Sequence, residues 1–147
     1  MNHIHIEPES LSPWSALQQF ESTYLQDHTN IGATASFVGT MRDFNEGENI
    51  TSMYLEHYPQ MTHQQLQQLV DKAHKKWSLL HSLVIHRVGE ILPGEPIVLV
   101  AVWTSHRREA FEACRFIMET LKTSAPFWKK ESLSDGSVRW VEKNTPG

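Results

Sequence analysis

The chain has 147 residues, 39% of them hydrophobic and 20% charged, which suits one folded domain spanning 1–147 rather than a disordered segment. A formal net charge of −4 argues against a nucleic-acid-binding protein, and a single cysteine excludes an internal disulfide. Because no apolar run reaches transmembrane length and the first residues lack a signal-peptide pattern, we expect a cytoplasmic protein.

The N-terminal part of the chain predicts a strand, a helix and a second strand. Alternating polarity over 3–7 indicates the first strand. Ser12 followed by Pro13 predicts a helix start, with the serine as N-cap and the proline in the first helical position. Small and β-forming residues over 32–42 predict the next strand, in which Gly39 marks a bulge or a close approach.

The middle of the chain continues with strands around one helix. A strand over 50–58 follows a polar loop, and Thr62 with Gln65 predicts a capping box at the start of the next helix. Strands are then expected over 82–90 and 97–103. The last of these is apolar throughout, so we expect it to be central and covered on both faces.

The C-terminal part predicts a helix and a closing hairpin. The helix is expected over 107–123, and its inward face is predicted to comprise Ala110, Phe111, Cys114, Ile117, Met118 and Leu121. Strands over 127–133 and 137–143 flank Ser-Asp-Gly, a sequence typical of a hairpin turn. The resulting order, β-α-β-β-α-β-β-α-β-β, favours an α+β fold with a largely antiparallel sheet.

Familiar catalytic motifs are missing from the sequence. His3 and His5 can share a strand face, but two histidines alone do not make a zinc site, so no metal and no cofactor is expected. Cys114 falls on the apolar face of its helix and is predicted to be a buried hydrophobe rather than a nucleophile. Neither a nucleophile elbow nor a phosphate-binding glycine loop is present.

Cationic residues at the ends of predicted elements are the remaining candidates for chemistry. Arg42 ends a strand, His106 and Arg107 begin a helix, Lys122 ends that helix, and Lys129 lies in the following strand. A helix N-terminus with basic neighbours favours a phosphate or carboxylate ligand. Taken singly, each has an ordinary alternative: Lys122 complements a helix dipole and Arg42 is a solvated loop charge.

Pro126 determines whether the two lysines can act together. In a fully extended chain Lys122 and Lys129 would lie up to about 23 Å apart, too far to share a small substrate. A proline cannot continue the helix, so we expect a helix exit and turn that bring the lysines closer. Phe127 and Trp128 then face opposite sides of the strand, one towards the core and the other available to line a pocket.

Five segments together resemble the catalytic (large) subunit family of molybdopterin synthases. They follow one another in family order from about residue 32 to residue 141: VGTMRDFN, LEHYPQMT, VIHRVGEILPGE, TSHRREAFEACRFIMETLKTSAPFWKKE and RWVE. The resemblance implies an α/β hammerhead fold with an additional small antiparallel β-subdomain.

The resemblance also implies an activity and partners. The family works as a homodimer that becomes a heterotetramer when a small ubiquitin-like subunit binds each large one. The C-terminal Gly-Gly of the small subunit carries a thiocarboxylate, the sulfur donor. Two sulfur transfers to cyclic pyranopterin monophosphate give the dithiolene of molybdopterin, in the biosynthesis of the molybdenum cofactor, and the large subunit needs no metal.

Site residues are carried over position by position from this resemblance. Lys122 and Lys129 match the family's active-site lysines and are expected to be catalytic. Further substrate contacts are expected from Thr40, Met41, Arg42, His106, Arg107, Lys130 and Glu131. Thr40 and Ser124 stand where family members often have basic residues, and both departures remove positive charge near the expected site.

The expected roles follow from charge. A thiocarboxylate and a cyclic phosphate repel each other unless cations are fixed around them. Arg42, His106 and Arg107 are expected to hold the phosphate, while Lys129 steers the thiocarboxylate. Lys122 acts either as general acid/base or as a nucleophile towards the acyl carbon, and the sequence does not separate these roles.

A different class of function is a non-catalytic adaptor that binds a ubiquitin-like partner. Such a protein would keep its function after Lys122 is neutralised. The sequence also leaves open the order of the two transfers and which protomer supplies each residue of a site.

Overall fold

The larger of the two sheets forms the body of the molecule in the computed structural model, which describes residues 2–124 and 127–141. Its strand order is β1-β5-β7-β2. The bounds are Asn2–Glu7 for β1, Leu79–Arg87 for β5, Pro96–Thr104 for β7 and Ala33–Thr40 for β2. Only the β1–β5 pair among these neighbours is parallel, which confirms the predicted α+β class with a largely antiparallel sheet.

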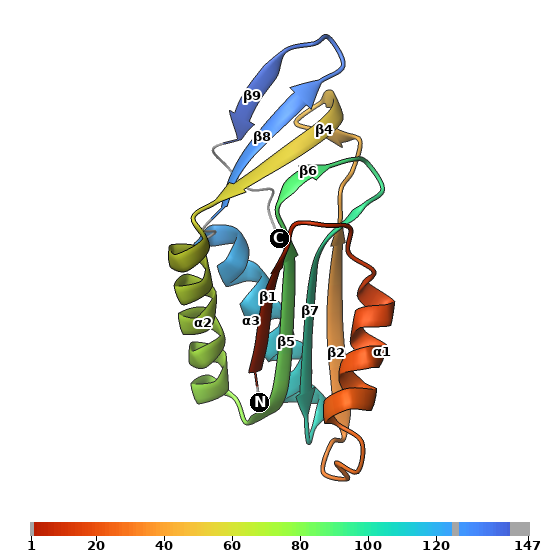
Figure 1. Ribbon diagram of the computed structural model, residues 1–147. Helices are drawn as coiled ribbons and strands as arrows, with labels where there is room; N and C mark the ends of the chain where they lie inside the picture. The colour runs from red at the N-terminus through yellow and green to blue at the C-terminus, as the bar shows by residue number, and fades with distance from the viewer. Residues whose placement is uncertain (1, 125–126, 142–147) are drawn as a thin grey trace.

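A smaller antiparallel sheet lies beyond one end of the larger one (Figure 1). It follows the order β3-β4-β8-β9, and β6 also pairs with β4. The bounds are Phe44–Asn45 for β3, Glu48–His57 for β4, Gly89–Ile91 for β6, Phe127–Leu133 for β8 and Val138–Val141 for β9. The predicted closing hairpin is confirmed as β8 and β9, and Gly136 supplies the positive φ of 87° that its turn requires.

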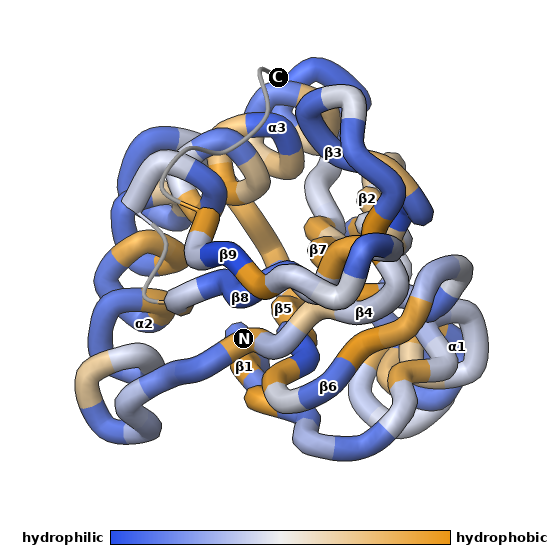
Figure 2. The backbone as a smooth tube through the Cα atoms, turned by 90° about the horizontal axis from the view of Figure 1, so that it is seen from above, coloured by the Kyte–Doolittle hydropathy of each residue, from blue (hydrophilic) through white to orange (hydrophobic). Residues whose placement is uncertain are grey.

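Helices cover the larger sheet on both faces. Their bounds are Pro13–Tyr24 for α1, Pro59–Lys76 for α2 and Arg107–Thr123 for α3. Apolar side chains of α1 pack on one face of the sheet, and those of α2 and α3 pack on the other. Strand β7 therefore runs through the middle as a hydrophobic segment, buried from Val98 to Thr104, as its apolar sequence predicts (Figure 2).

Two details of the predicted helices are wrong. Helix α2 begins at Pro59 with Tyr58 as N-cap, so Thr62 lies inside the helix, fully buried, and is not a cap. Phe111 is 70% exposed, because the buried face of α3 follows Ala110, Cys114 and Ile117, and Phe111 lies 100° further round the helix. No helix in the described part of the chain is long and apolar enough to span a membrane.

Gly39 redirects the chain from the larger sheet to the smaller one. The pairing of β2 with β7 shifts register between Gly39 and Thr40, as predicted for a bulge. A Cβ at position 39 would lie 2.8 Å from Cγ1 of Val98, so the close approach requires glycine. Met41 is then held by backbone hydrogen bonds of 2.9 Å to the carbonyl of Glu95 and 2.8 Å from the amide of Gly94. These contacts fix the direction in which the next residue, Arg42, leaves the sheet.

Candidate active site

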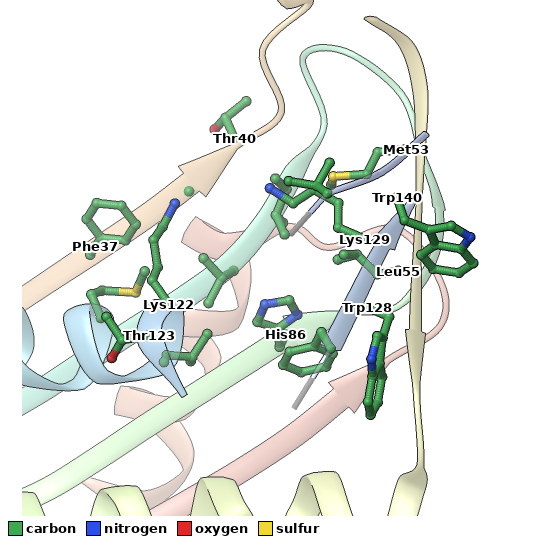
Figure 3. A pocket seen from close by; sticks show the side chains of 17 residues that line it. Phe37, Thr40, Met53, Leu55, His86, Lys122, Thr123, Trp128, Lys129 and Trp140 are labelled. Atoms are coloured by element: carbon green, nitrogen blue, oxygen red, sulfur yellow. The ribbon is translucent and has the colours of Figure 1, made fainter. Parts of the chain in front are cut away.

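The structure brings Lys122 and Lys129 to one cavity. Lys122 comes from the last turn of α3, and Lys129 comes from β8 in the smaller sheet. Both line a cavity of about 530 Å³ between the two sheets, and Figure 3 shows their side chains in it. The predicted bend at Pro126 lies outside the described residues, but the elements on either side of it place the amines in a common space.

Arg42 lies in an adjoining cavity of about 270 Å³ that both lysines also line. Its guanidinium carbon is 4.7 Å from the ring centroid of Phe44, a cation–π contact that helps to hold an otherwise exposed side chain. The predicted residues that line this second cavity are Thr40, Met41, Arg42, Lys122, Lys129 and Glu131. Sequence positions from 40 to 131 therefore converge on one continuous cationic region.

Alternation along β8 separates the predicted residues of that strand. Phe127, Lys129 and Glu131 face inwards, whereas Lys130 is on the opposite face of the sheet. The ammonium of Lys130 lies 5.8 Å from the ring centroid of Trp140 and borders a different hollow. The structure therefore does not bring Lys130 to the lysine cavity.

Glu131 reaches the cavity, but its carboxylate is already bound by neighbouring strands. Its side chain is buried, and Nε of Arg139 donates a 3.0 Å hydrogen bond to Oε1. Nδ2 of Asn45 donates a 3.0 Å bond to Oε2. Arg139 also donates from Nη2 to the carbonyl of Asn45 at 3.0 Å. Glu131 therefore ties β3, β8 and β9 together beside Lys129.

His106 and Arg107 lie at the other end of α3. His106 is the N-cap and Arg107 the first helical residue, and both are exposed. A rise of 1.5 Å per residue puts them about 24 Å from Lys122 along the helix axis. One copy of the chain therefore does not bring them to the lysine cavity.

The cavity is cationic and partly desolvated, and both properties act on Lys129. Burial lowers the pKa of Lys129, and the neighbouring charges of Lys122 and Arg42 lower it further, while Glu131 opposes the shift. An amine in this setting loses its proton more readily than a solvated lysine.

His86 is a cavity residue that the sequence interpretation did not select. It lies in β5, is 6% exposed and lines the cavity with Lys122 and Lys129. Its ring stacks on Phe127 with 3.9 Å between centroids. Burial lowers the pKa of His86 to about 4. The available signal was a titratable side chain inside the largely apolar run LVIHRV near the end of β5.

Cys114 is the sequence candidate whose predicted environment the structure confirms. Cys114 is buried, as predicted, and burial raises the pKa of its thiol to about 11, so it is not a ready nucleophile. Within residues 2–124 and 127–141, no three His, Cys, Asp or Glu side chains are grouped so that they could hold a metal ion.

Comparison with known proteins links this chain to one family. A family model described as MoaE protein matches residues 8–124. The molybdopterin synthase catalytic subunit of Ralstonia nicotianae is 56% identical over 112 residues, which are 76% of this chain and 63% of that protein. Its counterpart in Pseudomonas aeruginosa is 47% identical over 139 residues, 95% of this chain and 89% of that protein. An alignment of that length necessarily includes Lys129.

The fold is also shared with a solved structure. The molybdopterin biosynthesis MoaE protein from Burkholderia ambifaria matches with a TM-score of 0.79 and 39% identity, covering 100% of this chain and 93% of that one. Because the match covers the whole chain, it includes the helices and strands that form the cavity.

Proposed function

This chain belongs to the MoaE family of molybdopterin synthase catalytic subunits, and we propose that its lysine cavity carries out the sulfur transfer of molybdenum cofactor biosynthesis. The sulfur donor is the C-terminal thiocarboxylate of a small ubiquitin-like subunit that ends in Gly-Gly. The acceptor is cyclic pyranopterin monophosphate, and two transfers build its dithiolene. The observation that carries this proposal is the convergence of Lys122, Lys129 and Arg42 on two joined cavities.

The cations of the site offset the electrostatic repulsion between the two reactants. Donor and acceptor are both anions, and their approach in a desolvated site is strongly repulsive without fixed positive charge. Lys129 is partly buried beside Lys122 and Arg42. An anion that binds in the cavity reduces the electrostatic repulsion among these cations. Anion binding and the close approach of the cations therefore favour each other.

The lysines have different positions and therefore different roles. Lys129 projects from β8 and steers the thiocarboxylate, while Lys122 approaches from the end of α3. Lys122 serves the sulfur-transfer step as general acid/base or attacks the acyl carbon. Arg42 holds the phosphate end of the substrate from the adjoining cavity.

His106 and Arg107 join such a site only from a second copy of the chain. A hollow of about 610 Å³ runs between α3 and β2, which is an edge strand of the larger sheet. Phe37 and Phe111 border it, 41% and 70% exposed. A twofold axis near the middle of α3 would place the N-terminus of one α3 beside Lys122 of the other copy. The homodimer implied by the family resemblance would therefore bring His106 and Arg107 to the lysine cavity.

The test is reconstitution with the thiocarboxylated small subunit and the cyclic pterin, with dithiolene product as the readout. Lys122→Ala and Lys129→Ala are each expected to lower turnover by at least about 100-fold with the fold unchanged, because each removes a charge that contacts the reacting anions. Lys130→Ala is the matched control on the opposite face of β8 and is expected to retain near-normal turnover. Normal turnover by Lys122→Ala, with the small subunit still bound, would instead indicate the adaptor function.

A further inference from the structure

His86 is a buried titratable side chain to which the sulfur-transfer scheme gives no task. Its ring lies in the wall of the lysine cavity, at the end of β5, where it is only 6% exposed. Phe127 covers one ring face at a centroid distance of 3.9 Å. Figure 3 shows His86 below the side chains of Lys122 and Lys129 in the same space.

The hydrogen bonding of His86 identifies its tautomer. Nδ1 lies 2.7 Å from the carbonyl oxygen of Arg87. A carbonyl can only accept, so Nδ1 carries the proton and donates it to this bond. In a neutral ring the lone pair is then on Nε2. Among the described residues, the hydrogen bond observed for the His86 ring is the one made by Nδ1.

The surroundings keep this ring neutral. Burial is the main cause of its low pKa, and the charges of Lys122 on α3, Lys129 on β8 and His57 on β4 act in the same direction. The carbonyl of Arg87 opposes them. The ring is therefore neutral at neutral pH, and its Nε2 lone pair can accept a proton once bound anions offset the neighbouring positive charges.

We propose that Nε2 of His86 is the general base for the water that releases the small subunit after each sulfur transfer. This inference rests on the proposed function. When the thiocarboxylate sulfur has bonded to the substrate, the acyl carbon of the small subunit is held in a thioester. Water adds its oxygen to that carbon, and the C–S bond breaks with its electron pair on sulfur. The products are a carboxylate on the small subunit and a thiolate on the substrate.

The protons of that step also balance. One proton of the attacking water passes to Nε2 of His86, and the other is lost from the new carboxylic acid to solvent. The imidazolium formed next to Lys122 and Lys129 is stabilised by the anions produced in the same step. Bound anions also offset the two lysine charges, which raises the pKa of His86 during the reaction and makes it a better base.

His86→Asn is the most informative variant. Its Nδ2 can still donate to the carbonyl of Arg87, but it has no group at the position of Nε2. His86→Gln is the converse, with an amide near the Nε2 position and no donor at Nδ1. Single-turnover mixing with thiocarboxylated small subunit and cyclic pterin, followed by mass spectrometry, measures thioester formation and thioester release separately.

The expected result is accumulation of the small subunit–substrate thioester. In both variants release slows by at least about 100-fold while thioester formation stays within about threefold of wild type. A purely structural role of His86 would slow formation and release together, and wild-type release in either variant would overturn the proposal. If the wild-type protein forms neither thioester nor product, the proposed function fails rather than the role of His86.

The wild-type protein provides a measurement that does not depend on folding of a variant. Bound anions raise the pKa of His86, but an imidazole still titrates well below a lysine amine, so release through His86 is expected to level off by about pH 8. Release by a lysine amine would continue to rise with pH above this point, because more of the amine is deprotonated. A rate that still rises between about pH 8 and pH 9 would therefore assign the proton to a lysine and refute the assignment to His86.

Discussion

Glu131→Gln distinguishes a structural carboxylate from a substrate contact. Glu131 is expected from the sequence to touch substrate, yet both its oxygens accept hydrogen bonds, from Arg139 and from Asn45. Its side chain is 5% exposed and that of Arg139 is 29% exposed. The glutamine keeps the size and one acceptor but removes the charge.

The expected cost follows from this burial. Breaking a fully buried ion pair costs about 3–5 kcal/mol. Arg139 is partly hydrated and keeps its bond to the carbonyl of Asn45, so about 2 kcal/mol is a reasonable value here. For a chain of this length that loss corresponds to a melting temperature lower by about 4–8 °C.

Thermal unfolding at fixed protein concentration measures the change, and a double-mutant cycle with Arg139→Met isolates the pair. The two single changes are expected to couple by about 1–2 kcal/mol. Turnover below the melting transition is expected to fall less than tenfold. A melting temperature within about 1 °C of wild type, together with lost sulfur transfer, would show that Glu131 contacts substrate and that the structural argument is wrong.

Two further predictions concern the lysines. Lys129→Met is expected to raise the free energy of unfolding at pH 7 and to lose that advantage towards pH 10.5. A lysine whose pKa is lowered in the folded state costs stability while it is protonated and none once it is neutral. Chemical denaturation across this pH range measures the difference between variant and wild type, and a constant difference would contradict the burial argument. Lys122→Ala and Arg107→Ala are each expected to be inactive, and mixing them under conditions of subunit exchange is expected to restore roughly a quarter of wild-type turnover, since half of the dimers are mixed and one site in each is intact. Failure to restore turnover in verified mixed dimers would place both residues in the same copy.

Local patterns in the sequence were sufficient for most of the fold. The apolar run of β7 predicted a central strand, and Ser-Asp-Gly predicted the β8–β9 turn, because both signals depend on a few adjacent residues. The bulge at Gly39 was predictable for the same reason. The capping box at Thr62 failed because Pro59 already starts the helix three residues earlier.

Long-range geometry limited the prediction of the site. Lys122 and Lys129 are close in sequence, so a local argument connected them, and Arg42 was grouped with them as a cation at the end of a strand. His106 and Arg107 were grouped with them by charge, although the length of α3 separates the two groups. The sequence identifies the cationic residues, but their charge alone does not show which of them come together in the folded protein.

Thr40 and Ser124 are neutral residues at positions where family members often have basic ones, and the structure places the two differently. Ser124 is the C-cap of α3 and borders a hollow next to α2 that also contains Lys72, not the lysine cavity. The positive charge that family members often have at this position would therefore lie outside the lysine cavity. Thr40 lines both parts of the cationic cavity, directly after the bulge at Gly39. In the proposed site, a neutral residue at Thr40 would leave the phosphate more dependent on Arg42 and on His106 and Arg107 of a second copy.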